Sequence, residues 1–323
     1  MLPKRLLTFF PPPEFLNTPY AGLSMSDKHI RAIQFERGVG GHLQIKKYAE
    51  LPLPAGAITG GRVNNKEQIV SVLQDLKKQT HIEYVRVSIP EEKAYLFEIE
   101  IPLVDPHEVR SAIEFKIEEN VPWPADKVVF DYIVTEKNIE KSHIKAIVSA
   151  LPSKFVDIYM SLFSSSDLTP FVFEIESQSI ARALLDPHDT DTSLIAHFQR
   201  DKIGICVVSK GIVRFTSTFN PTESWYDNPA TVTAEIKKVV SYWISNRSGE
   251  GDEKLIQKVF VSGDFVDDSI VSYLSSTLKI ETRLGNVWKN VLDVNQSLPD
   301  ISFLDSLKYA PAVGLALPAE SLI

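Results

Sequence analysis

Apolar residues alternate with polar ones in short runs along this chain and recur at helical spacing in longer runs, so strands and helices are expected to follow one another. Three short strands separated by polar turns are predicted over residues 20–48. A helix capped by Asn64 or Asn65 is expected next. The buried strand Tyr84–Ile89 then ends at Pro90.

The same order of elements returns in the last third of the sequence. Three strands are predicted at Ser193–Gln199, Ile203–Val208 and Ile212–Phe219. The long helix Ala230–Ser245 and the strand Lys258–Ser262 follow. Two halves that each open with three strands and continue into a helix and a strand indicate an internal duplication.

A different arrangement separates the two halves. From Tyr95 the pattern predicts a strand, a helix from Asp105 to Asn120, a hairpin, a helix and the strand Pro170–Ile175. Such a unit is typical of an α+β subdomain. The predicted division is listed by residue numbers: an N-terminal extension at 1–19, a first half at 20–92 and 173–190, an inserted subdomain at 93–172, and a second half at 191–323.

Composition narrows the functional classes. A chain of 323 residues with 44% hydrophobic and 24% charged residues is typical of a folded protein with two domains. The net charge of −8 argues against non-specific binding of nucleic acid. The sequence contains no run of about 18 apolar residues, so no transmembrane helix is predicted. The apolar stretch Leu6–Phe10 is either a strap on the protein's own surface or a contact for a partner or membrane surface.

Side chains that could carry catalysis are scattered. The seven histidines form no metal-binding pair, and no nucleophile motif of the form G-x-S-x-G occurs. The single cysteine, Cys206, lies in an apolar run and is expected to be a buried, inert thiol. No catalytic residue and no metal site are predicted. Trp123, between two prolines, would be an anchor for a partner if it is exposed.

The segment from Ala112 to Tyr132 carries the clearest family signal. Its informative positions are Ile113, Glu114, Glu118, Val121, Pro122, Val128, Asp131 and Tyr132, and they are followed by Ala150–Ser153, Tyr159, Leu168–Pro170 and Val313–Leu317. The order and spacing of these residues resemble the type IV pilus assembly protein PilM family, which is actin-like and related to FtsA. Asp167 replaces a usual glycine. The resemblance implies an α/β, actin-like (ribonuclease H-like) duplicated fold with an inserted α+β subdomain.

The nucleotide motifs implied by the resemblance are altered. Two phosphate turns of the family carry glycines and Asp residues that bind Mg²⁺ or its waters. Positions that match the three motifs are Gly22, Ser24 and Ser26 in the first, His197 and Phe198 in the second, and Ser262, Gly263 and Asp264 in the third. Phe198 is expected to project its ring into the phosphate turn. Asp27 could serve as a displaced metal ligand. No cofactor is expected. If the nucleotide site still functions, the cofactor would be ATP with Mg²⁺.

The resemblance also implies two functions. One is a cytoplasmic scaffold at the inner face of the inner membrane, which binds the N-terminal tail of a bitopic, PilN-like membrane protein. The groove is expected between the first half and the inserted subdomain, walled by the helix 109–120 and by the edge of the sheet that contains Tyr84–Ile89, with Arg110, Glu114, Glu118 and Trp123 as partner-binding residues. The alternative is a working actin-like ATPase of the pilus or of a type II secretion system, similar to GspL, and it demands intact phosphate turns.

Overall fold

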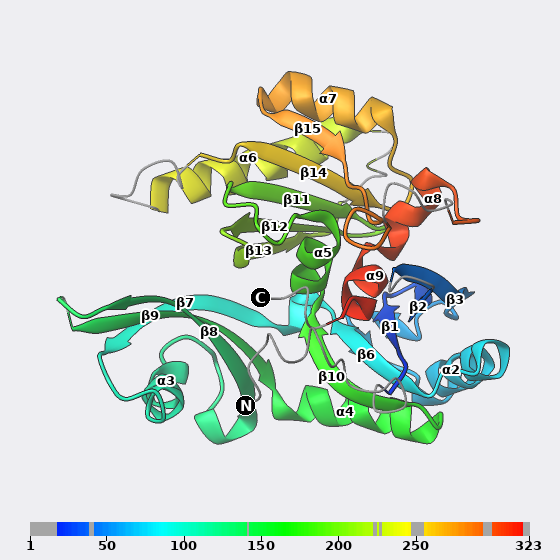
Figure 1. The fold of residues 1–323 in the computed structure, drawn as a ribbon, viewed down its shortest axis with the longest axis horizontal. Helices are drawn as coiled ribbons and strands as arrows, with labels where there is room; N and C mark the ends of the chain where they lie inside the picture. The colour runs from blue at the N-terminus through cyan, green and yellow to red at the C-terminus, as the bar shows by residue number, and fades with distance from the viewer. Residues whose placement is uncertain are drawn as a thin grey trace.

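Two sheets of identical topology form the two halves of the protein, as Figure 1 shows for the computed structural model. The structure describes residues 18–38, 42–140, 142–221, 225, 228–246, 255–292 and 299–318. The strap predicted at Leu6–Phe10 and the rest of residues 1–17 lie outside the described residues.

The first sheet has the strand order β10-β6-β1-β2-β3. β1 pairs antiparallel with β2 and parallel with β6, which pairs parallel with β10. The strands are β1 Tyr20–Met25, β2 His29–Arg37, β3 Leu43–Pro52, β6 Tyr84–Ile89 and β10 Thr169–Ile175, and the short strands β4 Ile58–Thr59 and β5 Arg62–Val63 form a separate hairpin.

The second sheet repeats this plan with the order β13-β12-β11-β14-β15. β11 again pairs antiparallel with the next strand and parallel with a later one. Its strands are β11 Ser193–Phe198, β12 Ile203–Ser209, β13 Ile212–Phe219, β14 Lys258–Gly263 and β15 Glu281–Leu284. All six residues of β11 are buried, as expected for a central strand covered on both faces. The predicted duplication is therefore confirmed.

The helices connect and cover these sheets. α2 begins where the Asn65 side chain accepts a hydrogen bond from the Gln68 amide and ends at His81, whose φ of 52° is left-handed. The α-helices are α2 Lys66–Thr80, α3 Val109–Ile117, α4 Ser153–Ser165, α5 Glu176–Leu184, α6 Pro229–Asn246, α7 Asp268–Leu278, α8 Phe303–Ser306 and α9 Ala310–Ala316. Short 3-10 helices are η2 Glu91–Lys93, η3 Ala125–Lys127 and η5 Leu307–Tyr309.

The inserted subdomain is smaller than the sequence pattern suggested. Its sheet has the order β7-β9-β8, built from β7 Tyr95–Pro102, β8 Val128–Asn138 and β9 His143–Pro152, and α3 packs on one face. The predicted boundary at residue 172 assigned α4 and β10 to this unit. Instead β10 pairs with β6, and Tyr159, Leu162 and Phe163 of α4 belong to the core of the first half. Long-range pairing with β6 therefore decides where these elements belong.

α9 lies at the centre of the molecule, in red in Figure 1, and contacts α5, β1, β2 and β6. Its residues Ala310 to Ala316 are all buried, and four of them share one core with Ile195 and Phe260 of the second sheet, namely Ala310, Ala312, Val313 and Ala316. Two close contacts between backbones hold α9 in place. A Cβ on Gly314 would lie 1.8 Å from the Ser179 carbonyl oxygen, and one on Gly22 would lie 1.9 Å from that of Ala312. α9 therefore joins the two halves.

Candidate functional site: the domain junction and the cleft beside β10

The three predicted nucleotide motifs meet at the junction between the two halves. The turn between β1 and β2 reaches the turn between β11 and β12, where Lys28 Nζ lies 3.0 Å from an Asp201 carboxylate oxygen. The end of β14 lies beside the end of β11, because Phe198 pairs with Gly263. The fold thus brings the three matched segments together at one junction.

Both glycines of the predicted nucleotide site are required for packing. The Gly22 position is filled by the backbone of α9. Gly263 has a φ of 113°, and a Cβ there would lie 1.9 Å from the Phe198 carbonyl oxygen. Ser24 is buried in β1. The Ser26 hydroxyl accepts the His29 amide at 3.0 Å and so stabilises its own turn.

The ring of Phe198 does not enter the phosphate turn, so that prediction was wrong. The side chain is fully buried in the core of the second half, with its ring 4.6 Å from that of Trp225. Alternation along β11 explains the difference, because Leu194, Ala196 and Phe198 all face this core. The intervening residue, His197, faces the domain junction instead.

Ion pairs cross the junction where a nucleotide would be expected. Arg31 of β2 is buried and donates to Asp264 at 2.6 Å and to Glu50 at 2.8 Å. Lys202, in the turn before β12, is also buried and lies 3.0 Å from a carboxylate oxygen of Glu92. The Arg31–Asp264 and Lys202–Glu92 pairs hold the two halves together, and the third sequence motif contributes Asp264 to them.

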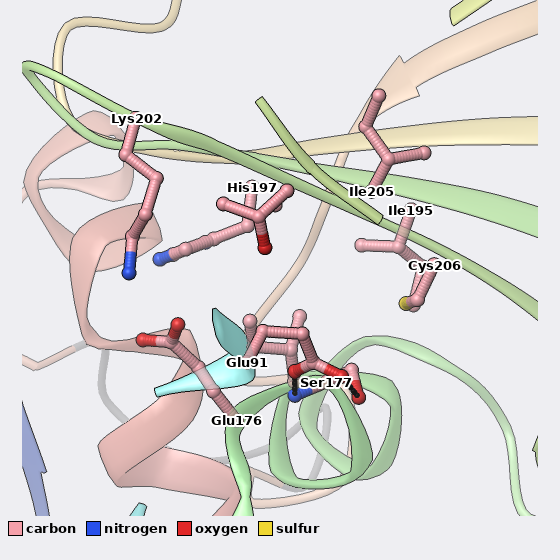
Figure 2. Close-up of a pocket in the computed structure, with 11 residues that line it drawn as sticks. Glu91, Glu176, Ser177, Ile195, His197, Lys202, Ile205 and Cys206 are labelled. Atoms are coloured by element: carbon pink, nitrogen blue, oxygen red, sulfur yellow. Dashed lines mark hydrogen bonds between the residues drawn. The ribbon is translucent and has the colours of Figure 1, made fainter. Parts of the chain in front are cut away.

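A small cavity of about 20 Å³ lies beneath this network, between α5 and the second sheet (Figure 2). That volume holds about one water molecule. Figure 2 shows Lys202 and Glu176 pointing toward one another across it. Burial, together with the nearby charges of Arg31 and Lys202, lowers the pKa of His197 to about 3, so the imidazole is neutral when its Nδ1 meets the Ser262 hydroxyl at 2.9 Å.

Two buried groups of this cavity have pKa values shifted by desolvation. Burial raises the pKa of Glu91 to about 7, against the opposing effect of hydrogen bonds from the Ser177 amide and hydroxyl. Burial likewise raises the pKa of the Cys206 thiol, which agrees with the inert role predicted for it.

Asp27, suggested as a displaced metal ligand, has both carboxylate oxygens occupied. One accepts the Gly60 amide at 2.6 Å and the other the Gly61 amide at 3.1 Å. Across the described part of the chain, no group of three or more His, Cys, Asp or Glu side chains is placed to hold a metal ion.

A second and much larger cleft, about 410 Å³ in volume, separates the inserted subdomain from the first half. Apolar side chains line it from both sides. Val129 and Ile133 of β8 are about half exposed, and Val172 and Phe173 of β10 lie opposite. Within the described residues, β8 and β10 are each the terminal strand of their sheet. The cleft therefore lies beside two strand edges with apolar side chains between them.

The position of this cleft corrects one wall of the expected groove. The edge of the sheet that contains β6 is the neighbouring strand β10, which does line the cleft. The helix expected as a wall, α3, packs on the opposite face of the inserted sheet, against Phe130 and Val148. The predicted helix also starts later, at Val109, since residues 105–108 form a turn.

None of the four predicted partner-binding residues lines the cleft. Glu114 is exposed on α3, and Glu118 accepts the Ala125 amide at 2.9 Å. Trp123 is half-buried, with its ring 5.1 Å from that of Tyr95. Arg110 donates to the Phe130 carbonyl at 3.2 Å.

Duplicated five-stranded sheets around one junction, with an insertion in the first half, define this chain as an actin-like protein. A family model described as type IV pilus assembly protein PilM matches residues 22–209. The chain belongs to that family. A search of curated proteins gives no match.

Solved structures agree on the fold. The PilM-PilN type IV pilus biogenesis complex superposes with a TM-score of 0.77 at 14% identity, over 95% of this chain and 99% of that one. The cytoplasmic domain of EpsL, an inner membrane component of the type II secretion system of Vibrio cholerae, gives 0.50 at 9% identity, over 77% and 84%. The ethanolamine utilization protein EutJ of Carboxydothermus hydrogenoformans gives 0.50 at 11%, over 95% and 90%.

Proposed function

We propose that this protein is a scaffold of type IV pilus assembly that binds the cytoplasmic tail of a PilN-like inner-membrane protein in the cleft between β8 and β10. The cleft itself carries the proposal: it combines apolar walls with two strand edges, which is what capture of an extended peptide requires. The structure solved for the PilM-PilN complex supports a PilN-like partner.

In this proposal the protein lies at the inner face of the inner membrane and is held there by its partner. None of the helices in the described part of the chain combines the length and apolar character needed to span a bilayer. Binding a tail that is joined to a single membrane-spanning helix would supply the attachment. Nucleic acid is not expected as a partner of a chain with a net charge of −8.

The proposed scaffold needs no nucleotide. Packing of α9 against Gly22 and the Arg31–Asp264 ion pair support a degenerate nucleotide site. A working ATPase of the pilus or of a type II secretion system is the alternative, and it requires Mg²⁺-ATP to bind near Ser26 and Gly263. The match to the pilus family over residues 22–209 favours the pilus over the secretion system.

A pair of adjacent residues on β8 tests the site of tail binding. Ile133 lines the cleft and is 45% exposed, whereas Val134 is 43% exposed and is not among the cleft residues. Ile133→Glu should weaken binding of the synthetic N-terminal tail of the PilN-like protein by at least about tenfold, because a charge would enter an apolar contact. Val134→Glu is the matched control and should bind normally in calorimetry. Equal affinities for both variants would place the tail elsewhere.

A further inference from the structure

The N-terminal extension joins the fold beside the cleft between β8 and β10. Tyr20 is the first residue of β1, and its ring lies edge-on to that of Phe171 of β10, with 5.3 Å between the centroids. Its hydroxyl donates to the Leu317 carbonyl at 3.0 Å. The guanidinium of Arg86, which lines the cleft, lies 5.6 Å from the centre of the Tyr20 ring. Residues 1–17 are therefore attached to the described part of the chain next to this cleft.

Two buried arginines of the cleft have hydrogen-bond donors without an acceptor. Arg86 extends from β6 and Arg182 from α5, and both side chains are about nine-tenths buried and paired with the Glu174 carboxylate of β10. The Nε–H groups of both arginines have no hydrogen-bond partner within the part of the chain that the structure describes. A buried donor without a partner is destabilising, and native proteins rarely tolerate it. These three residues are named the cleft floor, and they carry an excess of one positive charge.

Residues 1–17 contain the groups that would complete the cleft floor. Glu14 is their only acidic residue, and it stands between the apolar residues Pro13 and Phe15. Within the cleft, Asp131 does not serve the floor, because it is exposed on β8 and its carboxylate accepts the Tyr132 amide at 2.9 Å. A carboxylate flanked by apolar side chains matches a cleft that has apolar walls and unpaired donors at its floor.

The connection between Glu14 and the fold is long enough for this contact. Glu14 lies six positions before Tyr20, and an extended chain spans about 20 Å over that length. The prolines at positions 11–13 restrict the backbone to extended conformations, so this stretch loses less conformational entropy on docking than a flexible segment would. Because the segment is tethered to the cleft, its effective concentration there is about millimolar.

We infer that the N-terminal extension occupies the cleft of its own chain, with the Glu14 carboxylate accepting from the Nε–H groups of Arg86 and Arg182 and with Phe15 between the apolar walls. The extension is then autoinhibitory. Any other ligand of the cleft must displace it first, and the apparent affinity of that ligand is reduced in proportion to the fraction of molecules whose cleft is open. The inference goes beyond the proposed function, because it concerns the free protein and needs no partner.

Rates of thiol labelling in the full chain test this occupancy. The single native cysteine, Cys206, is buried and contributes little background. Ile133→Cys places a thiol in the cleft, and Val134→Cys is the matched control, since the native side chains are 45% and 43% exposed and only Ile133 lines the cleft. A maleimide should label Ile133→Cys at least about tenfold more slowly than Val134→Cys, because the extension covers the cleft. Equal rates would overturn the inference.

Charge reversal at Glu14 then assigns the protection to the cleft floor. Glu14→Lys sets a third cation against Arg86 and Arg182, so labelling of Ile133→Cys should accelerate about 10- to 100-fold, as expected for the loss of a hydrogen bond between charged groups. Glu14→Gln keeps an oxygen acceptor, and its labelling rate should lie between those of the other two proteins. Protection that persists in Glu14→Lys would contradict the contact with the floor.

Binding of the synthetic tail of the PilN-like protein separates this inference from the proposed function. The labelling measurements contain no partner, so equal labelling rates would overturn the inference and leave tail binding standing. If both hold, Glu14→Lys should raise the calorimetric affinity for the tail by the same factor by which it accelerates labelling. Accelerated labelling without any binding of the tail would overturn the proposed function and support the autoinhibitory contact.

Discussion

At the scale of single residues, the junction shows that a residue can match a sequence motif and still have a different role. Gly22 and Gly263 fit a phosphate-binding pattern, yet backbone atoms of α9 and β11 occupy the space that a Cβ would need. Phe198 was expected in the site and is instead in the core. A motif fixes the position of a residue in the fold, while its role depends on neighbours that are distant in the sequence.

Gly22→Ala should destabilise the protein. The added methyl group would overlap the Ala312 carbonyl, so α9 must move, and we expect the free energy of unfolding to fall by about 3 kcal/mol. Urea denaturation followed by circular dichroism measures the effect. Gly204→Ala on β12 is the control, because a Cβ there has no neighbour within 4 Å. Equal stability of the two variants would refute the packing role of Gly22.

Glu91 should make stability depend on pH. Burial raises its pKa from the ordinary 4.5 to about 7 in the folded protein. Below pH 4.5 the group is neutral in both states. As pH rises from 4.5 to 7 the unfolded chain loses the proton first, so the free energy of unfolding falls by up to about 3 kcal/mol.

Glu91→Gln removes this ionisation while it keeps an oxygen that can accept from Ser177. The variant should therefore gain stability over the native protein between pH 5 and pH 8, by about 2–3 kcal/mol. Burial also raises the pKa of Glu176, which is present in both proteins. The difference between their free energies of unfolding therefore reports on Glu91. Parallel curves of stability against pH would contradict the assignment.

At the scale of elements, local periodicity predicted most helices and strands, and pairing between distant strands decided the rest. The repeated strand pattern at residues 20–48 and 193–219 was sufficient to predict two similar halves. The sequence could not predict that β10 pairs with β6, because a strand with this pattern could equally form the edge of the inserted sheet. β15, with only four residues, is too short for a periodic signal. The helical wall expected for the cleft was wrong, because local periodicity does not show which face of the inserted sheet α3 covers.

The position of α3 leads to a prediction that reverses the sequence-based one. From the sequence, charge reversal at Glu114 together with Glu118 is expected to weaken the partner complex, because their helix is expected to line the groove. α3 covers the other face of the inserted sheet, so Glu114→Lys should change the affinity for the tail peptide less than twofold. A pull-down with the tail peptide, carried out in parallel on Glu114→Lys and Ile133→Glu, provides the comparison. Clear weakening would move the docking surface to α3, where Phe115 is 86% exposed.

At the scale of the whole molecule, ion pairs connect the two halves at the junction where the matched nucleotide motifs meet. The pair of Arg31 with Asp264 is buried and depends little on salt, whereas that of Lys28 with Asp201 is exposed and contributes at most about 1 kcal/mol. Residues so far apart in the sequence give no local signal of these pairs. Only the folded arrangement of two sheets reveals them.

Mg²⁺-ATP should therefore leave the melting temperature unchanged. A ligand present at one hundred times its Kd stabilises a folded protein by about 2.7 kcal/mol, which a thermal melt detects easily. At millimolar Mg²⁺-ATP we expect a shift of less than about 1 °C, since the junction is occupied by Arg31, Lys202 and their partners. A shift of several degrees would favour the ATPase alternative.

The central position of α9 has a consequence for synthesis of the protein on the ribosome. Domains commonly fold in order as they emerge. Here β1, β2 and β6 are made early, but the helix that packs against them comes only at Ala310–Ala316. The first half consequently stays incomplete, with Gly22 and its neighbours uncovered, until translation has passed residue 316. Nascent chains stalled before that point are candidates for chaperone binding, and the protein reaches its final form in a single late step.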